Sequence, residues 1–152
     1  RFPNRANAFQ FDTDTRNIFI CADSKRLLSA FLELLSNAAE ADNSCGSIQI
    51  HSHVNACGHT VTVSVTGKGS LSEINPSEMQ TNPLIDADAP LTAQLSTPFF
   101  STKENHAGLG LSIVAQVCHT HHAGFELYSR NGFTTAGITF PILAMDDMRN
   151  TI

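Results

Sequence analysis

The residues with the clearest potential for chemistry lie in the stretch TPFFSTKENHAGLGLSIV, residues 97–114. Its first part is a polar loop with three side chains that can donate hydrogen bonds to phosphate oxygens: Ser101, Thr102 and Lys103. Its second part is a glycine-containing turn that leads directly into an apolar run of helical character: Gly108, Leu109 and Gly110. Glycine lets the backbone approach a ligand closely, and a helix N-terminus attracts anions. The stretch therefore predicts a phosphate-binding site, although a glycine turn that merely starts a helix has the same pattern.

A second pair of candidates, Glu33 and Asn37, lies four residues apart in a predicted helix and so projects from one face of it. Asn37 is flanked by small residues in the segment ELLSNAAEA. A carboxamide in that setting can coordinate a divalent cation through its carbonyl oxygen. On spacing alone, however, an exposed polar residue is the simpler interpretation.

These candidates must be positioned by the strands and helices that the periodicity of the chain predicts. We expect strands over residues 8–12, 17–22, 47–54, 59–65, 125–130 and 135–143, and helices over residues 23–42 and 108–122. Residues 70–96 are polar with little periodicity, so we interpret the segment 70–107 as a lid, with a short helix near residues 71–79. This order predicts an α+β fold: a two-layer sandwich in which a mixed, mostly antiparallel sheet of about five strands is covered on one face by helices.

Length and composition bound the class of protein. A chain of 152 residues, 41% hydrophobic and 15% charged, is expected to form one soluble domain over residues 1–152. The net charge of −5 argues against a general nucleic-acid binder. No apolar run approaches the roughly 20 residues that cross a bilayer, so we expect no membrane contact by this domain. The chain starts at Arg1 without a signal peptide, which suggests a fragment of a longer protein.

The spacing of the cysteines and histidines favours neither a disulfide framework nor a metal site. The four cysteines are scattered, which favours reduced thiols and a cytoplasmic location: Cys21, Cys45, Cys57 and Cys118. Three histidines cluster near a predicted helix end: His119, His121 and His122. They have no carboxylate or cysteine at a convincing metal-ligand spacing, so we interpret them as a helix-terminal cluster that interacts favourably with the dipole.

Four short motifs in this order resemble the ATP-binding catalytic domain of sensor histidine kinases. That family belongs to a superfamily shared with type II topoisomerases, mismatch-repair ATPases and a heat-shock chaperone. ELLSNAAEA is similar to the family's N box, VTGKG to its G1 box, TPFFSTK to its F box and AGLGLSIV to its G2 box. The resemblance extends from about Phe9 to Leu143 and implies a Bergerat-type ATP-binding fold. It also implies ATP and Mg²⁺ as ligands.

The resemblance assigns roles by position. Asn37 would hold the magnesium ion that bridges the ATP phosphates, and Lys103 would approach those phosphates from the lid. The residues that the resemblance places around the nucleotide come from all four motifs and from the last strand: Asn37, Val65, Gly67, Gly69, Ser101, Thr102, Lys103, Gly108, Leu109, Gly110 and Thr135. The catalytic candidates among them are Asn37 and Lys103, joined by Glu33.

Three positions depart from the family pattern. Val65 stands where the family has an aspartate that accepts a hydrogen bond from the adenine amine. In this chain, Thr66 or an ordered water is the candidate acceptor in place of the aspartate. An unpartnered buried amine costs roughly 1–3 kcal/mol, or one to two powers of ten in affinity. His106 replaces a glycine usual in the G2 box. Glu33 replaces an Asn or His, and in the ATPase branches of the superfamily a glutamate here activates water.

The resemblance implies an ATP-binding catalytic domain that donates the γ-phosphoryl group to a histidine on a separate dimerisation domain of the same parent protein. No H-E-x-x-x-P-like motif occurs in this chain to supply that histidine. A response regulator receiver domain is the expected further partner. Two alternatives are a degenerate domain with weak or no ATP binding that serves as a docking or regulatory module, and a stand-alone ATPase that uses Glu33.

Overall fold

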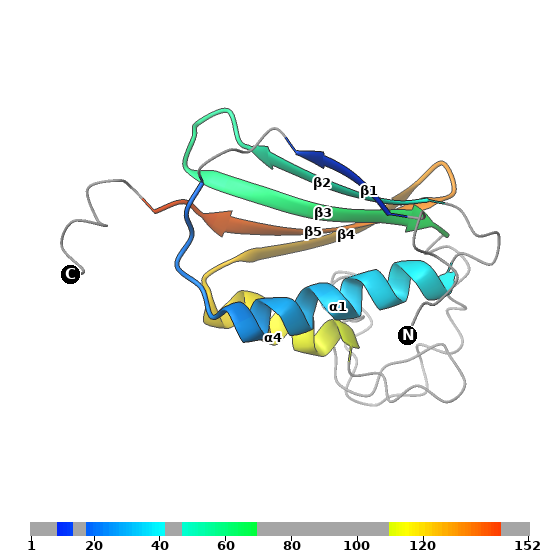
Figure 1. Cartoon of the computed structure of the whole chain (residues 1–152), viewed down its shortest axis with the longest axis horizontal. Helices are drawn as coiled ribbons and strands as arrows, with labels where there is room; N and C mark the ends of the chain where they lie inside the picture. Colours follow the sequence, from blue (N-terminus) through cyan, green and yellow to red (C-terminus); the bar gives the residue numbers. More distant parts are fainter. Residues whose placement is uncertain (1–8, 14–17, 42–46, 70–109, 144–152) are drawn as a thin grey trace, which may run out of the picture.

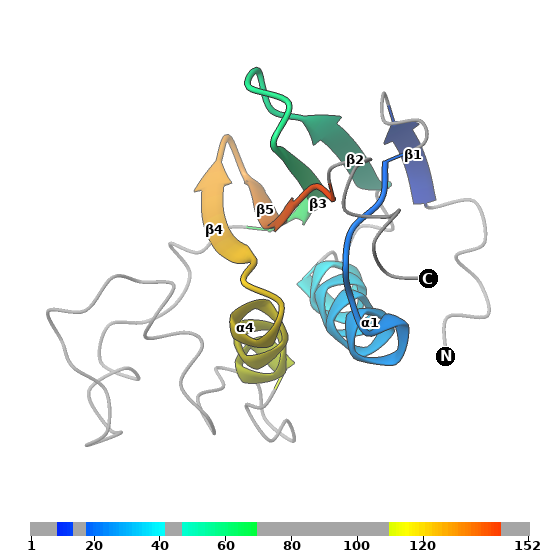
Figure 2. The same ribbon diagram turned by 90° about the vertical axis from the view of Figure 1, so that its left-hand side faces the viewer.

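The computed structural model describes residues 9–13, 18–41, 47–69 and 110–143. They form two layers, a sheet and a pair of helices that lie side by side against one of its faces (Figures 1 and 2). The elements are β1 (Phe9–Thr13), α1 (Ser24–Ala41), β2 (Ile48–Val54), β3 (Thr60–Lys68), α4 (Gly110–Thr120), β4 (Gly124–Arg130) and β5 (Phe133–Pro141). The predicted α+β sandwich with helices on one face is confirmed.

The described strands form one five-stranded sheet in the order β1-β2-β3-β5-β4. β1 pairs with β2 in parallel, whereas the other neighbouring strands pair antiparallel. The sheet is therefore mixed and mostly antiparallel, as predicted, with β1 at one edge and β4 at the other (Figure 2).

Helix α1 begins where the sequence predicts because Asp23 caps it. One carboxylate oxygen of Asp23 accepts hydrogen bonds from the backbone N–H groups of Lys25, at 2.9 Å, and Arg26, at 3.1 Å. The bond from Arg26 is the largest cause that holds the pKa of Asp23 below its ordinary value. The backbone N–H of Asp23 donates in turn to Nε2 of His121, 2.9 Å away, just beyond the end of α4. The start of one helix is thus joined directly to the end of the other.

Two tight turns set the register of the antiparallel strands. Between β2 and β3, the side-chain oxygen of Asn55 accepts hydrogen bonds from the backbone N–H groups of His59, at 3.0 Å, and Thr60, at 3.2 Å. Between β4 and β5, Asn131 and Gly132 have φ angles of 54° and 77°, the combination that a two-residue type I′ turn requires. Strand β5 therefore begins at residue 133, earlier than the predicted start at residue 135.

The core lies between the helices and the side of the sheet that they cover, which we call the inner face. Ala30 and Leu34 of α1 and Val114 of α4 are buried there. The buried residues that the sheet contributes are Ile48, Val61, Val65, Ala136, Ile138 and Phe140. Side chains alternate between faces along a strand, so the residues between them lie on the other, outer face. That face carries paired hydroxyls, such as Thr62 and Thr139 at 2.8 Å.

The predicted strand over residues 17–22 is wrong for the described residues 18–22, which belong to no strand. They run from the sheet layer down to the start of α1 (Figure 1), so they cannot pair along a strand. The backbone oxygen of Phe19 accepts one hydrogen bond, from the N–H of Leu143 at 2.9 Å. Ile18 and Ile20 contribute to a pocket lining, and Ile20 also packs against the core. The β-branched and aromatic residues of this segment therefore belong to a connection in which Ile20 is partly buried and Phe19 is exposed.

Other predictions fall partly or wholly outside the described residues. The lid over residues 70–107, its short helix at 71–79 and Cys45 all lie there. In the part of the chain that is described, Cys21, Cys57 and Cys118 are free thiols, as predicted. Neither described helix combines the length and apolar character that crossing a membrane requires.

Candidate functional site

Three of the predicted site residues meet where α1 passes the first turn of α4. The carboxylate of Glu33 and the carboxamide of Asn37 both project from α1 toward Gly110, the first residue of α4. A Cβ atom placed on Gly110 would lie 2.9 Å from Oε2 of Glu33 and 3.6 Å from Nδ2 of Asn37. The four-residue spacing therefore puts both side chains at one helix N-terminus, where a phosphate would be attracted.

The glycines at the end of β3 let this strand pass close to the same helix. A Cβ atom on Gly67 would lie 3.0 Å from Cβ of Ala38 and 3.3 Å from its backbone oxygen. A Cβ atom on Gly69, whose φ is +147°, would lie 3.2 Å from Cβ of Ala41. The small residues of ELLSNAAEA and of VTGKG thus face each other across the two layers. The tight approach fixes the end of β3 beside the helix that carries Asn37.

The position of Gly69 is also fixed from the other side, by the turn between β4 and β5. Its backbone N–H donates to the carbonyl oxygen of Gly132 at 2.9 Å. Its own carbonyl oxygen accepts a hydrogen bond from Oγ1 of Thr134 at 3.0 Å. That hydroxyl is also hydrogen-bonded to Oγ of Ser129 at 2.6 Å. Sequence reasoning missed Thr134, for which the only available signal was its place just after the Asn-Gly turn.

Val65 lies on the inner face, 3% exposed, in register with Ile50 and Ala136. Its side chain has no hydrogen-bond acceptor. Thr66 does not replace one there, because its hydroxyl is on the outer face, 2.9 Å from that of its cross-strand partner Thr135. The expectation that Thr135 helps to line the site is therefore corrected. Its side chain lies on the outer face of the sheet, because strand alternation places it opposite to the inner face that α1 and Asn37 cover.

The comparisons with known proteins decide the family. Residues 22–144 match the family described as histidine kinase-, DNA gyrase B-, and HSP90-like ATPase. This match spans most of the chain, including the N-terminal cap of α1 and all of β5. The chain belongs to this ATPase family.

The relatives of this chain within the family include sensor histidine kinases. The sensory histidine kinase/phosphatase NtrB of Rhizobium leguminosarum bv. phaseoli is 33% identical over 127 residues, which is 80% of this chain and 32% of that protein. The catalytic domain of histidine kinase ThkA has 28% identity and a TM-score of 0.66, and the match covers 88% of this chain and 77% of that domain. ThkA in complex with the response regulator protein TrrA has 26% identity and a TM-score of 0.63, and the match covers 89% of this chain and 34% of that chain. The chain spans about a third or less of the length of the curated relatives it matches.

The oxygen donors at the α1–α4 contact are compatible with the Mg²⁺ ion that the sequence predicts. Asn37 offers a carbonyl oxygen and Glu33 a carboxylate, the hard oxygen ligands that Mg²⁺ prefers. Within the described residues, no group of three or more histidine, cysteine, aspartate or glutamate side chains could hold a metal ion. One or two protein ligands are in keeping with Mg²⁺, which retains several waters and binds substrate phosphates.

Within the histidine cluster at the end of α4, His121 has a structural role. Nδ1 of His121 is hydrogen-bonded to the backbone oxygen of Val117 at 2.7 Å, while Nε2 accepts from Asp23. Both ring nitrogens are therefore used inside the fold. For His121, these contacts agree with the interpretation as a helix-end feature, and for the other two histidines it stays a prediction.

Several predicted site residues lie outside the described residues. They are Ser101, Thr102, Lys103, Gly108 and Leu109, together with the unusual His106. Their roles in holding phosphate remain predictions. Of the eleven positions that the resemblance places around the nucleotide, the structure brings Asn37, Gly67, Gly69 and Gly110 to the junction of α1, α4 and β3.

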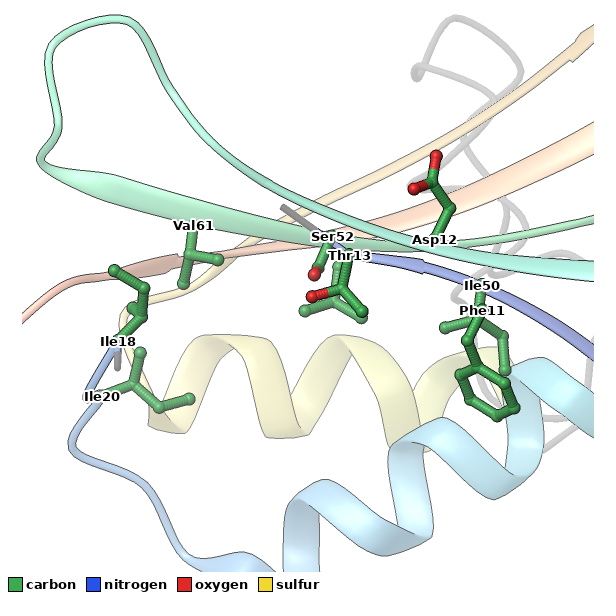
Figure 3. Close-up of a pocket in the computed structure, with 9 residues that line it drawn as sticks. Phe11, Asp12, Thr13, Ile18, Ile20, Ile50, Ser52 and Val61 are labelled. Carbon is green, nitrogen blue, oxygen red and sulfur yellow. The ribbon is translucent and has the colours of Figure 1, made fainter. Parts of the chain in front are cut away.

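A pocket of about 320 Å³ lies elsewhere, between residues 18–20 and the inner face of β1, β2 and β3 (Figure 3). Its lining is mainly aliphatic and aromatic, with Ile18, Ile20 and Phe11 among the contributors, and Asp12 points away from the helices. No predicted site residue contributes to it. Its apolar character makes it unsuited to phosphates.

Proposed function

We propose that this chain is the ATP-binding catalytic domain of a two-component sensor histidine kinase. In this role it donates the γ-phosphoryl group of ATP to a histidine on a separate dimerisation domain of the same parent protein. The observation that supports the proposal best is the meeting of Glu33, Asn37 and Gly110 at the N-terminus of α4. The relatives support it as well, because they include sensory histidine kinases of which the chain matches about a third.

The chemistry of the proposed reaction consists mainly of positioning and charge neutralisation. Asn37 would hold the magnesium ion through its side-chain oxygen, and the bound ion would neutralise charge on the phosphates. The free N–H groups in the first turn of α4 would bind phosphate oxygens. The predicted contribution of Lys103, Ser101 and Thr102 is to cover the phosphates from the lid. The rigid contact between β3 and α1 would keep the base and the phosphates at a fixed separation.

The proposed partners and location follow from the relatives. ThkA has been crystallised with the response regulator protein TrrA, so we propose a response regulator receiver domain as the recipient of the phosphoryl group from the histidine-bearing domain. A cytoplasmic location is proposed on the same basis. This location refers to the domain and is compatible with a membrane anchor elsewhere in the parent protein.

The decisive test is a calorimetric titration with ATP in the presence of Mg²⁺. We expect binding with a dissociation constant below the millimolar range, and its loss in Asn37→Ala. Gln116→Ala is a matched control, since it removes the same carboxamide group from an exposed position on α4. Absence of binding by the wild-type domain at millimolar nucleotide would contradict the kinase proposal. It would favour the degenerate docking module, for which the buried Val65 is the supporting observation.

A second candidate function is ATP hydrolysis with Glu33 as the base that activates water. The observation in its favour is that the Glu33 side chain is half-buried and directed at the start of α4, beside Asn37. If this function operates, Glu33→Gln should lower the rate of phosphate release from ATP by about 10²-fold or more. An unchanged rate in a phosphate-release assay removes this candidate and leaves the kinase proposal untouched.

A further inference from the structure

The space left by the missing side chain of Gly110 is filled by Glu33. Only 2.9 Å separates Oε2 of Glu33 from the place where a Cβ atom of Gly110 would lie, closer than real Cβ contacts allow. Glycine at this position is commonly explained by the close approach of a ligand. Here the nearest neighbour is a carboxylate of the same chain, at the end of the flexible Glu33 side chain.

This carboxylate brings a negative charge to the end of α4 that attracts anions. None of the residues that the structure describes forms an ion pair with Glu33, since the described pairs join Arg26 to Asp23 and His51 to Asp12. The Glu33 side chain is half-buried, so solvent screens its charge less than it screens a fully exposed one. Within the described residues, a phosphate bound at this helix end would therefore have as its neighbour a carboxylate that no cation pairs with.

We infer that Glu33 makes this site selective for metal-complexed nucleotide over free nucleotide. The inference rests on the proposed function, because it concerns the nucleotide that the site would bind. Without a cation, the carboxylate and the phosphates repel each other. With a divalent cation, the carboxylate and the Asn37 oxygen face a positive charge, and the repulsion becomes an attraction. Glu33 is then the residue that couples nucleotide affinity to Mg²⁺.

The test compares nucleotide affinity with and without metal in Glu33→Gln. Glutamine has the same size as glutamate, so it keeps the packing against Gly110 and removes only the charge. The matched control is Glu126→Gln on β4. The Glu126 side chain also lies over a glycine, 2.9 Å from a Cβ atom placed on Gly137, but it does so on the outer face of the sheet. Thermal unfolding of each variant, followed by circular dichroism, verifies that it is folded.

Binding of a fluorescent ATP analogue is measured in excess Mg²⁺ and in excess EDTA. We expect Glu33→Gln to raise the affinity for metal-free nucleotide by about tenfold, the order that one charge near another produces at a protein surface. Its affinity for the magnesium complex should fall, because the attraction between the carboxylate and the cation is lost, so the ratio between the two conditions shrinks. Glu126→Gln should keep the wild-type ratio.

The outcomes separate this inference from the proposed function. If wild type and Glu33→Gln bind nucleotide with the same ratio between Mg²⁺ and EDTA, the inference about Glu33 is overturned while the proposed function stands. If Glu126→Gln shifts the ratio as strongly as Glu33→Gln, the effect is one of net charge and the inference is also overturned. If neither wild type nor Glu33→Gln binds nucleotide in either condition, both proposals fail together.

Discussion

At the scale of single residues, the glycines of the candidate site are explained by neighbours within the protein. Gly67 and Gly69 make room for Ala38 and Ala41, and Gly110 makes room for Glu33. Each pair joins segments that are distant in sequence. Gly67 and Gly69 are therefore needed to bring β3 close to α1 before any ligand arrives, whereas a side chain at Gly110 would displace the flexible end of Glu33.

Gly67→Ala tests this explanation. The new Cβ atom would meet both the side chain and the backbone of Ala38 at 3.0–3.3 Å, and the backbone of a helix cannot move aside cheaply. We expect the free energy of unfolding to fall by about 1–3 kcal/mol, measured by denaturant titration. Gly124→Ala is the control, because its Cβ atom would meet Thr139 at an ordinary 3.8 Å. Equal losses in the two variants would show that close packing at Gly67 is not the cause.

Val65 is the residue that decides how the base end of the proposed site works. Replacement by Asp or Asn would restore an acceptor on the inner face for the amine of adenine. We expect Val65→Asp and Val65→Asn to strengthen ATP binding roughly ten- to a hundredfold in calorimetry. The buried polar group should lower the thermal midpoint without nucleotide, and Asn should lower it less than Asp. Val63→Asp, on the same face, should not improve binding. If Val65→Asn shows no gain either, Val65 is not at the adenine.

At the scale of elements, the two helices are joined at the end away from Gly110. Asp23 caps α1 with its carboxylate, and its backbone N–H is held by His121 after the end of α4. The α4 helix therefore has one end fixed to the start of α1 and the other packed against Glu33 in the middle of α1. This arrangement makes the orientation of the α4 N-terminus depend on a cap at the opposite end.

The cap should make stability depend on pH in a defined range. Hydrogen bonding, first from the backbone N–H of Arg26, lowers the pKa of Asp23 in the folded protein from the ordinary value of 3.8. The carboxylate therefore contributes stability that is fully present above about pH 5 and is lost as the pH falls through the lowered folded value. We expect Asp23→Ala to lower the thermal midpoint by a few degrees at pH 7, and by less below pH 4, in circular dichroism melts.

Asp23→Asn is the control for this prediction. Asparagine is a comparable N-cap but does not titrate, so its midpoint should fall less steeply than that of wild type as the pH drops below 4. A difference between wild type and Asp23→Ala that stays constant down to pH 2 would contradict the role of the charged carboxylate.

At the scale of the whole molecule, the two faces of the sheet have different roles. The inner face of the sheet and the two helices hold the core, while the outer face carries polar pairs such as Thr66 with Thr135. The candidate site lies where the layers meet, at the end of β3 and the start of α4. A site at such a junction is sensitive to the distance between layers, which the facing small residues of α1 and β3 set.

The sequence by itself determined the features that depend on neighbouring residues. The helix predicted over residues 23–42 and the strands predicted over residues 47–54 and 59–65 follow from local chemistry, and the structure confirms them as α1, β2 and β3, with Asp23 capping the helix and Asn55 closing the turn. The order of four motifs also indicated the family correctly. These predictions succeed because capping, helical periodicity and turn formation involve residues close together along the chain.

Only the tertiary structure decided the features that need a distant partner. An extended apolar segment such as residues 18–22 has the same sequence pattern in a strand and in a connection. The sequence of the segment does not show whether a neighbouring strand is there to pair with it. The face on which Thr135 lies depends on the pairing of β5 with β3, which joins Thr135 to the distant Thr66. The contact between Glu33 and Gly110 joins residues far apart in sequence. Packing across the two layers, rather than local propensity, brings that carboxylate to the start of α4.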